Sequence, residues 1–257
     1  MKKILLIAIF ILFVTFVLFF ADRKTLYAKT MENVNTISEE INNDMSDLIL
    51  SSNILSYSSS PYEIVANNED YDKLVSLGVV AVKPLYDKII NSPENGLIEY
   101  IYAMAIEDIM SQNFTYVTNS SQLNLEVMEE NHYTIEDLNY GWANAKEFAE
   151  AFSTYIKEIP ATYESIKNNK TLTYDIKIEK MSKIGLGVIP YLIEEINDST
   201  DSIDLAKDAL ISILINYNMD KEFTDSFSKI NDSYEKDSLI TIWIDKNFET
   251  YDLLKQI

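Results

Sequence analysis

An apolar run near the N-terminus constrains this chain more than any other feature of its sequence. The run extends from Ile4 to Ala21 and contains a single hydroxyl, that of Thr15. At about 1.5 Å of rise per residue, a helix of this length would reach roughly 27 Å, close to the hydrocarbon thickness of a bilayer. We therefore expect residues 1–24 to form a signal-anchor or transmembrane segment that contacts the membrane through residues 4–21.

The flanks of the run bear on its cleavage and its orientation. A cleaved signal peptide usually has a shorter apolar core and small residues before the cleavage site, whereas Phe19 stands at the third place before the candidate site after Ala21. We expect retention without cleavage, and secretion after signal cleavage is the alternative. Two lysines and the terminal amine precede the run, while Arg23 and Lys24 follow it beside Asp22. This small bias favours a single-pass protein of the cell membrane with its C-terminal domain outside.

The rest of the chain is strongly acidic. Beyond residue 24 it holds 17 lysines, no arginine and 40 Asp plus Glu residues, a net charge of −23. A nucleic-acid partner is excluded because such binding needs a basic surface. Residues 89–145 hold nine carboxylates and no Lys or Arg. They would attract a cation or a cationic partner, although a solvated surface that keeps the domain soluble is the simpler explanation.

Apolar residues recur at helical spacing along the chain, and no alternating run is long enough to predict a sheet. The fold class is therefore expected to be all-α. Residues 25–60 are predicted to hold an amphipathic stalk helix, with Val34 and Ile41 on its apolar stripe, and then a serine-rich linker. This helix either packs on the main domain or pairs with another copy of the chain.

The main domain carries the marks of a tandem duplication. Its two tryptophans, Trp142 and Trp243, lie 101 residues apart. Each copy also has a glycine suited to a helix C-cap, and a proline suited to the first turn of the next helix. These residues are Gly78 and Pro84 in the first copy, and Gly185 and Pro190 in the second. We expect one helical half at 61–160 and a similar one at 161–257.

The stretches 73–86 and 180–192 resemble the joint between HEAT-like helical repeats. In that family a helix ends in Leu-Gly, and the next begins with a small residue, an aliphatic residue and Pro. The resemblance implies an α-α superhelical domain that serves as a scaffold or binding surface. The repeat here is about 100 residues rather than about 40, and the arginine typical of the second helix is missing. No functional residue is therefore carried over.

Catalytic, metal and cofactor sites are not predicted. His132 is the sole histidine and no cysteine is present, so the usual zinc sites and a Cys nucleophile lack their residues. The stretch 197–208 has oxygen side chains at several positions of a calcium loop, but Ser202 stands where glycine is needed and Asp208 replaces the bidentate Glu. A loop between two helices explains it better.

Aromatic residues suggest one candidate binding site. The chain has 17 tyrosines and two tryptophans, types that favour interfaces and ligand grooves. A groove between the two copies is the hypothesis, and tyrosines that cover the edge of the core are the alternative. The candidate residues are Tyr86, Tyr100, Tyr102, Trp142, Tyr191 and Trp243.

Three functions remain open at this point. The leading hypothesis is a membrane-anchored, extracytoplasmic helical binding or scaffold protein that is not an enzyme and has a protein or cell-wall partner. A secreted or surface hydrolase that uses two carboxylates is the first alternative, and requires one of them to have a raised pKa. A surface sensor that responds to cations is the second.

Overall fold

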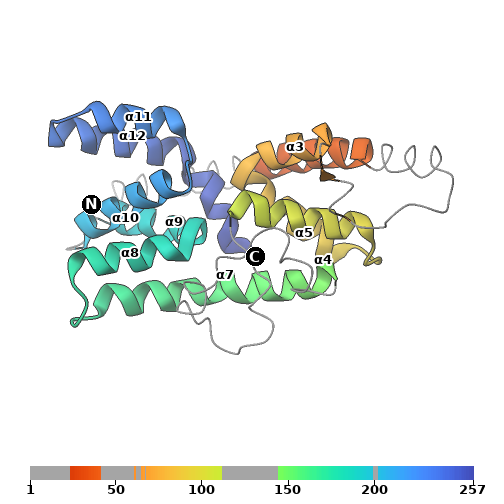
Figure 1. Ribbon diagram of the computed structural model, residues 1–257, viewed down its shortest axis with the longest axis horizontal. Coiled ribbons are helices and arrows are strands. Elements are labelled where there is room, and N and C mark those ends of the chain that lie inside the picture. Colours follow the sequence, from red (N-terminus) through yellow and green to blue (C-terminus); the bar gives the residue numbers. More distant parts are fainter. Residues whose placement is uncertain (1–23, 42–60, 62–64, 67, 112–143, 199–201) are drawn as a thin grey trace, which may run out of the picture.

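The computed structural model describes residues 24–41, 61, 65–66, 68–111, 144–198 and 202–257 (Figure 1). Every regular element in these ranges is a helix, which confirms the all-α prediction. Within them, no helix combines the length and apolar character needed to cross a bilayer. The expected membrane segment at residues 4–21 lies outside the described ranges, as do Trp142 and His132.

The first group of helices follows local signals in the sequence. Asn68 caps the first of them through Oδ1, which accepts from the backbone N–H groups of Asp70 and Tyr71 at 2.9 Å. Gly78 has a φ of 69° after the helix end, where glycine costs least. The elements are α3 (Glu69–Ser76), the 3₁₀ turn η1 (Gly78–Ala81), α4 (Val82–Asn91) and α5 (Leu97–Met110).

The second group repeats this order of elements. Gly185 has a φ of 78° at the end of its first helix, and Pro190 lies in the first turn of the helix after the 3₁₀ turn. The predicted roles of both glycines and of Pro190 are thus confirmed, and Pro84 likewise falls in the first turn of α4. The elements are α8 (Tyr174–Ile184), η4 (Gly185–Val188), α9 (Ile189–Asn197) and α10 (Ile203–Asn216).

A long helix, α7 (Ala145–Asn168), joins the two groups. It packs against α4 and α5 on one side and against α8 and η4 on the other, and Figure 1 shows it running beneath both groups. The boundary expected between residues 160 and 161 falls inside α7, which continues through Pro160. We therefore call α3 to α7 the first half and α8 onward the second half.

The second half ends in a helical hairpin and a short 3₁₀ turn. These are α11 (Lys221–Lys229), α12 (Ser233–Asp252) and η5 (Leu253–Gln256). The η5 turn packs against α4 and α7, so the C-terminus lies between the two groups of helices (Figure 1). There the Ser153 hydroxyl of α7 donates to the backbone oxygen of Ile257 at 3.3 Å.

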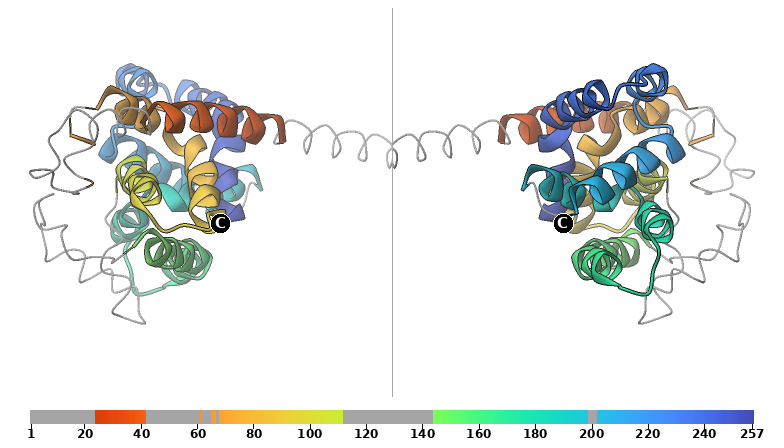
Figure 2. Two further views of the ribbon diagram at one scale, coloured as in Figure 1. Left: turned by 90° about the vertical axis from the view of Figure 1, so that its right-hand side faces the viewer. Right: turned by 90° about the vertical axis from the view of Figure 1, so that its left-hand side faces the viewer.

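The helix at residues 24–41 belongs to the domain core. Val34 and Ile41 are 0% and 1% exposed and join the same apolar cluster as the two groups of helices. The Tyr27 hydroxyl donates to Oδ2 of Asp87 in α4 at 2.6 Å. Figure 2 shows this helix lying along one edge of the domain. Of the two arrangements open to the predicted stalk helix, this part of it packs on the main domain.

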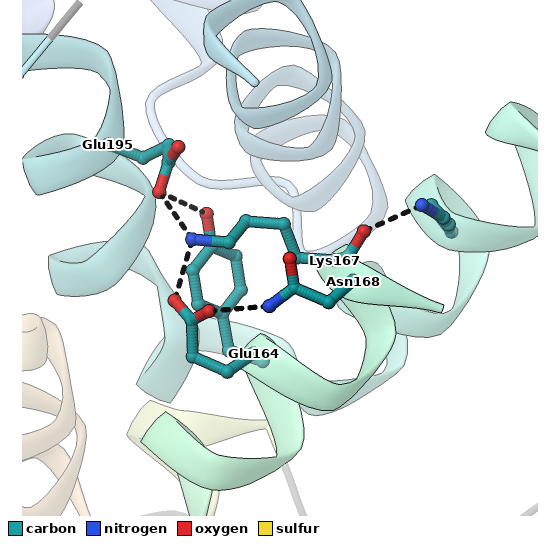
Figure 3. Close-up of polar contacts among 6 residues, drawn as sticks. Glu164, Lys167, Asn168 and Glu195 are labelled. Carbon is teal, nitrogen blue, oxygen red and sulfur yellow. Dashed lines mark hydrogen bonds and ion pairs between the residues drawn. The ribbon is translucent and has the colours of Figure 1, made fainter. Parts of the chain in front are cut away.

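A lysine ties α7 to the second half (Figure 3). Lys167 Nζ lies 2.6 Å from Glu164 Oε1 on its own helix and 2.9 Å from Glu195 Oε2 on α9. Asn168 donates to the other oxygen of Glu164 at 2.9 Å. Burial opposes the charge on Lys167, but the two carboxylates outweigh it and raise the lysine pKa. This network fixes the end of α7 against α9.

Candidate functional site

The structure separates the aromatic residues predicted to share a groove. Tyr86 and Tyr102 lie in the core, 8% and 5% exposed, and Tyr100 packs against it partly buried. The ring of Tyr191 is covered by the Lys255 ammonium, 4.9 Å from its centroid. These four tyrosines line none of the cavities described below.

Trp243 does line a cavity. The cavity measures about 310 Å³ and lies where the helix at 24–41, the η1 turn of the first half and the α11–α12 hairpin of the second half meet. We call it the junction pocket. Its walls are formed by Leu26, Leu77, Val79, Val80, Met219, Asp220, Trp243, Asn247, Thr250 and Tyr251.

Asp220 places a carboxylate in this pocket. It caps α11, and its Oδ1 accepts from the backbone N–H of Phe223 at 3.0 Å. Its Oδ2 accepts from the indole N–H of Trp243 at 3.1 Å. The residue has a φ of 47°, and Asn218 two positions earlier has 49°. Asp and Asn adopt this left-handed conformation more readily than most residues, so the chain can turn sharply and hold the carboxylate against the indole.

Aromatic rings form one wall beside the carboxylate. The rings of Trp243 and Tyr251 lie 5.7 Å apart at 44°, and Phe223 supports Trp243 from 5.9 Å. Trp243 is 4% exposed and Tyr251 is 3% exposed, so their positions are set by packing. Burial raises the pKa of Tyr251, and the negative charge of Asp220 raises it further. The pocket therefore combines a rigid aromatic wall with a negative potential.

A carboxylate-based hydrolase would need two carboxylates in one cavity, one of them with a raised pKa. A second cavity, of about 360 Å³, is lined by Asp175 and Glu179, both exposed on α8. Glu179 pairs with Lys183 at 3.0 Å, so it faces water and a cation. Burial raises the pKa of Asp108, but its Oδ2 accepts from the Tyr71 hydroxyl at 2.5 Å and it lines neither cavity.

A buried carboxylate, that of Glu99, serves the fold. It is 5% exposed and closes the start of α5, where its Oε2 accepts from the backbone N–H of Gly96 at 2.8 Å. Its Oε1 accepts from the Ser92 hydroxyl at 2.7 Å. Burial opposes ionisation of Glu99, but these hydrogen bonds and the charge of Lys146 lower its pKa overall. It is an ionised helix cap.

Metal ligands do not gather in the part of the chain that the structure describes, where no three His, Cys, Asp or Glu side chains could hold one ion together. The stretch 197–208 connects α9 to α10, and its residues 199–201 lie outside the described ranges. Asp208, at the twelfth place of the calcium-loop pattern, lies in α10. Its carboxylate accepts a hydrogen bond from the Tyr174 hydroxyl of α8 at 2.8 Å.

The sequence indicates Trp243 as a candidate site residue, but it does not indicate Asp220, which accepts the indole hydrogen bond. Asp220 has one local signal, an aspartate just before an amphipathic helix, which is typical of an N-cap. Its contact with an indole 23 positions away becomes visible only in the folded chain. No family model, no curated protein and no solved structure matches this chain.

Proposed function

We propose that this chain is a single-pass, membrane-anchored, extracytoplasmic helical binding protein whose ligand occupies the junction pocket. The observation that carries the proposal is the pocket's composition. Its walls are mostly apolar or aromatic, and they hold a few polar groups, of which the Asp220 carboxylate is fixed by two hydrogen bonds. That combination is typical of ligand sites, and about 310 Å³ is near the lower end of their usual volumes.

The proposal also interprets the architecture as a duplicated HEAT-like superhelix. It is supported by the order helix, 3₁₀ turn, helix, helix, which occurs once in α3–α5 and once in α8–α10. Two residues support it further, because Gly78 and Gly185 have positive φ at the same place in each copy. Stacked helical repeats commonly present binding surfaces where units meet, and the junction pocket lies at such a meeting point.

Attachment to the membrane is the second part of the proposal. The apolar run at 4–21 would provide the anchor, and the acidic remainder would face the outside. Leu26, shortly after the run, belongs to a pocket wall. The partner, a protein or a cell-wall component, would therefore contact a residue that closely follows the anchor in the sequence.

A photo-crosslinking amino acid placed at Val80 tests the pocket. Val80 is half-buried in the pocket wall, and Tyr234, 81% exposed on α12, is the matched position outside it. Irradiated whole cells should give a defined adduct from position 80 and none from position 234. Equal labelling at both positions, or none at position 80, would refute the pocket as a ligand site.

The membrane arrangement has its own test. The full chain should stay in the pellet after alkaline carbonate extraction, and protease added to intact cells should digest the domain. A chain released by carbonate, or one protected in intact cells and digested only after lysis, would refute the anchored, outward-facing arrangement.

A further inference from the structure

We infer that the junction pocket binds an alkylammonium group, that is, a protonated primary amine on an aliphatic stem. The inference rests on the proposed function, because it assigns a ligand class to the same site.

Asp220, like the buried Glu99, has no described lysine within ion-pair distance, whereas three other partly buried carboxylates of this chain do. These are Asp87 with Lys83 at 2.5 Å, Glu195 with Lys167 at 2.9 Å and Asp252 with Lys255 at 3.6 Å. The side-chain partners of Asp220 are two neutral N–H groups, from Phe223 and Trp243. Lys221 is exposed, and no ion pair joins any described lysine to Asp220.

The oxygens of Asp220 retain capacity for a further donor. A carboxylate offers about four lone-pair sites, and Asp220 uses one on each oxygen. A primary ammonium has three N–H donors and no acceptor, so it complements what is left. An alcohol could donate one hydrogen bond but would bring no charge, and a quaternary ammonium would bring charge without a donor.

The aromatic wall favours the same group. Trp243 and Tyr251 line the pocket beside Asp220 with the small part of each side chain that is exposed, 4% and 3%, and a cation close to such a ring is attracted by it. The raised pKa of Tyr251 agrees with this, since part of the shift comes from the charge of Asp220. A ligand cation would be held by the carboxylate and the aromatic wall together.

The protein builds this arrangement at three places among its described side chains. Lys83 lies beside Asp87 and the Tyr27 ring, and Lys255 lies beside Asp252 and the Tyr191 ring. The Lys167 ammonium lies against the Glu195 carboxylate (Figure 3). It also lies 5.2 Å from the centroid of the Tyr163 ring. Carboxylate, aromatic ring and alkylammonium are all present there. In the junction pocket the carboxylate and the rings are present, and the chain supplies no ammonium from its described residues.

The remaining walls suit an aliphatic stem. Leu26, Leu77, Val79, Val80 and Met219 present apolar surface in a cavity of about 310 Å³. That space suits a stem of a few methylenes, because burial of each one against an apolar wall is favourable. Such a group is found in a free diamine and in the side chain of a peptide lysine.

Titration of the full chain in detergent micelles with pentylammonium, and separately with pentan-1-ol, tests the inference. The chain has two tryptophans, so a Trp142→Phe background leaves the indole N–H of Trp243 as a single resonance in a ¹H–¹⁵N spectrum. Pentylammonium should shift that resonance saturably, and pentan-1-ol should bind at least tenfold more weakly. Asp220→Asn keeps the helix cap and should weaken pentylammonium at least tenfold.

Two further variants make the result specific. Asp232→Asn is the matched control, because Asp232 caps α12 by accepting from Glu235 N at 3.0 Å and lies outside the pocket. It should leave pentylammonium affinity unchanged. Val80→Trp would fill the pocket without touching the cap of α11 and should abolish the shift, which keeps the test valid if Asp220→Asn does not fold.

The outcomes distinguish this inference from the proposed function. Pentan-1-ol binding as well as pentylammonium, or full affinity in a folded Asp220→Asn variant, would overturn the ammonium assignment and leave the pocket as a ligand site. The absence of a shift with pentylammonium would overturn it as well, whereas the pocket as a ligand site is refuted by the crosslinking test at Val80 and the membrane arrangement by the carbonate and protease tests. If pentylammonium binds, 1,5-diaminopentane and the peptide Gly-Lys-Gly then show whether a free amine or a lysine side chain is preferred.

Discussion

Replacement of Gly187 by alanine tests the packing of η4 against α7. A Cβ at this position would lie 2.4 Å from Cδ1 of Ile159 and 3.1 Å from the hydroxyl of Tyr155. Carbon atoms in favourable contact are about 3.5–4.0 Å apart, so the methyl group needs more than 1 Å of extra room. Ile159 is 2% exposed and the Tyr155 hydroxyl donates to the backbone oxygen of Ile184, so neither side chain can swing into solvent.

The size of the effect follows from two opposing contributions. Forcing a methyl group into a packed core costs about 1–3 kcal/mol. Replacing glycine by alanine restricts the unfolded chain and returns about 0.4–1 kcal/mol. We therefore expect Gly187→Ala to lower the free energy of unfolding by about 1–2 kcal/mol.

A double-mutant cycle isolates the cause of this loss. Ile159→Val removes the clashing Cδ1 and should cost about 0.5–1.5 kcal/mol alone. The Gly187→Ala, Ile159→Val double variant should be about 1 kcal/mol more stable than the sum of the single effects predicts. Urea unfolding of the full chain, followed by far-UV circular dichroism, measures all four proteins. Ile89→Val, at a fully buried isoleucine of α4, is the control and should add to Gly187→Ala without coupling. Strict additivity with Ile159→Val, or a Gly187→Ala variant as stable as the parent, would refute the reasoning.

Two other sites give further predictions. Tyr71→Phe removes the hydrogen bond to Asp108 and should cost about 1–2 kcal/mol in the same assay. Because burial raises the pKa of Asp108, its contribution to stability is full below the unfolded pKa and is lost as the pH rises through the folded one. Asp108→Asn should therefore lose less stability than the parent between about pH 3 and pH 7, and parallel pH profiles would contradict this. Lys167→Met leaves Glu195, 10% exposed at its side chain, without its cation and should cost about 1–2 kcal/mol. The exposed Lys183→Met control should cost less than about 0.5 kcal/mol, and equal losses would argue against a special role for the Lys167 network.

Features governed by local rules were predictable from the sequence. The glycines at 78 and 185 have positive φ because a helix ends there. The proline that follows each glycine lies in the first turn of the next helix, where a missing N–H costs little. The all-α class was also predictable, because the spacing of apolar residues along a helix is a local pattern. The boundary at 160/161 was not recoverable in this way, because α7 continues through Pro160 and is held on both sides by tertiary packing.

The candidate site depended on contacts that no local pattern encodes. Trp243 was a candidate from its type and position, and although it is buried like Tyr86 and Tyr102, it alone among the described candidates lines the junction pocket. Tyr86 shows why, since its ring lies 6.2 Å from that of Phe152 on α7, which begins more than 50 positions later. The junction pocket likewise combines walls from η1 and α12, segments that meet only after the two halves have packed together.

The two 3₁₀ turns explain why one junction is filled and the other holds a pocket. Each turn packs against the long helix of the other half, η4 against α7 and η1 against α12. The turns begin at Gly185 and Gly78, so their third residues, Gly187 and Val80, are equivalent. At Gly187 the approach to α7 leaves no room for a Cβ, whereas Val80 is half-buried on the wall of the junction pocket. The contact of η4 with α7 is thus closed around a glycine, whereas the equivalent place in η1 is a valine that lines the junction pocket. The two groups of helices share the order of helix and 3₁₀ turn, and they differ at the third residue of that turn, where only the valine lies beside a cavity described above.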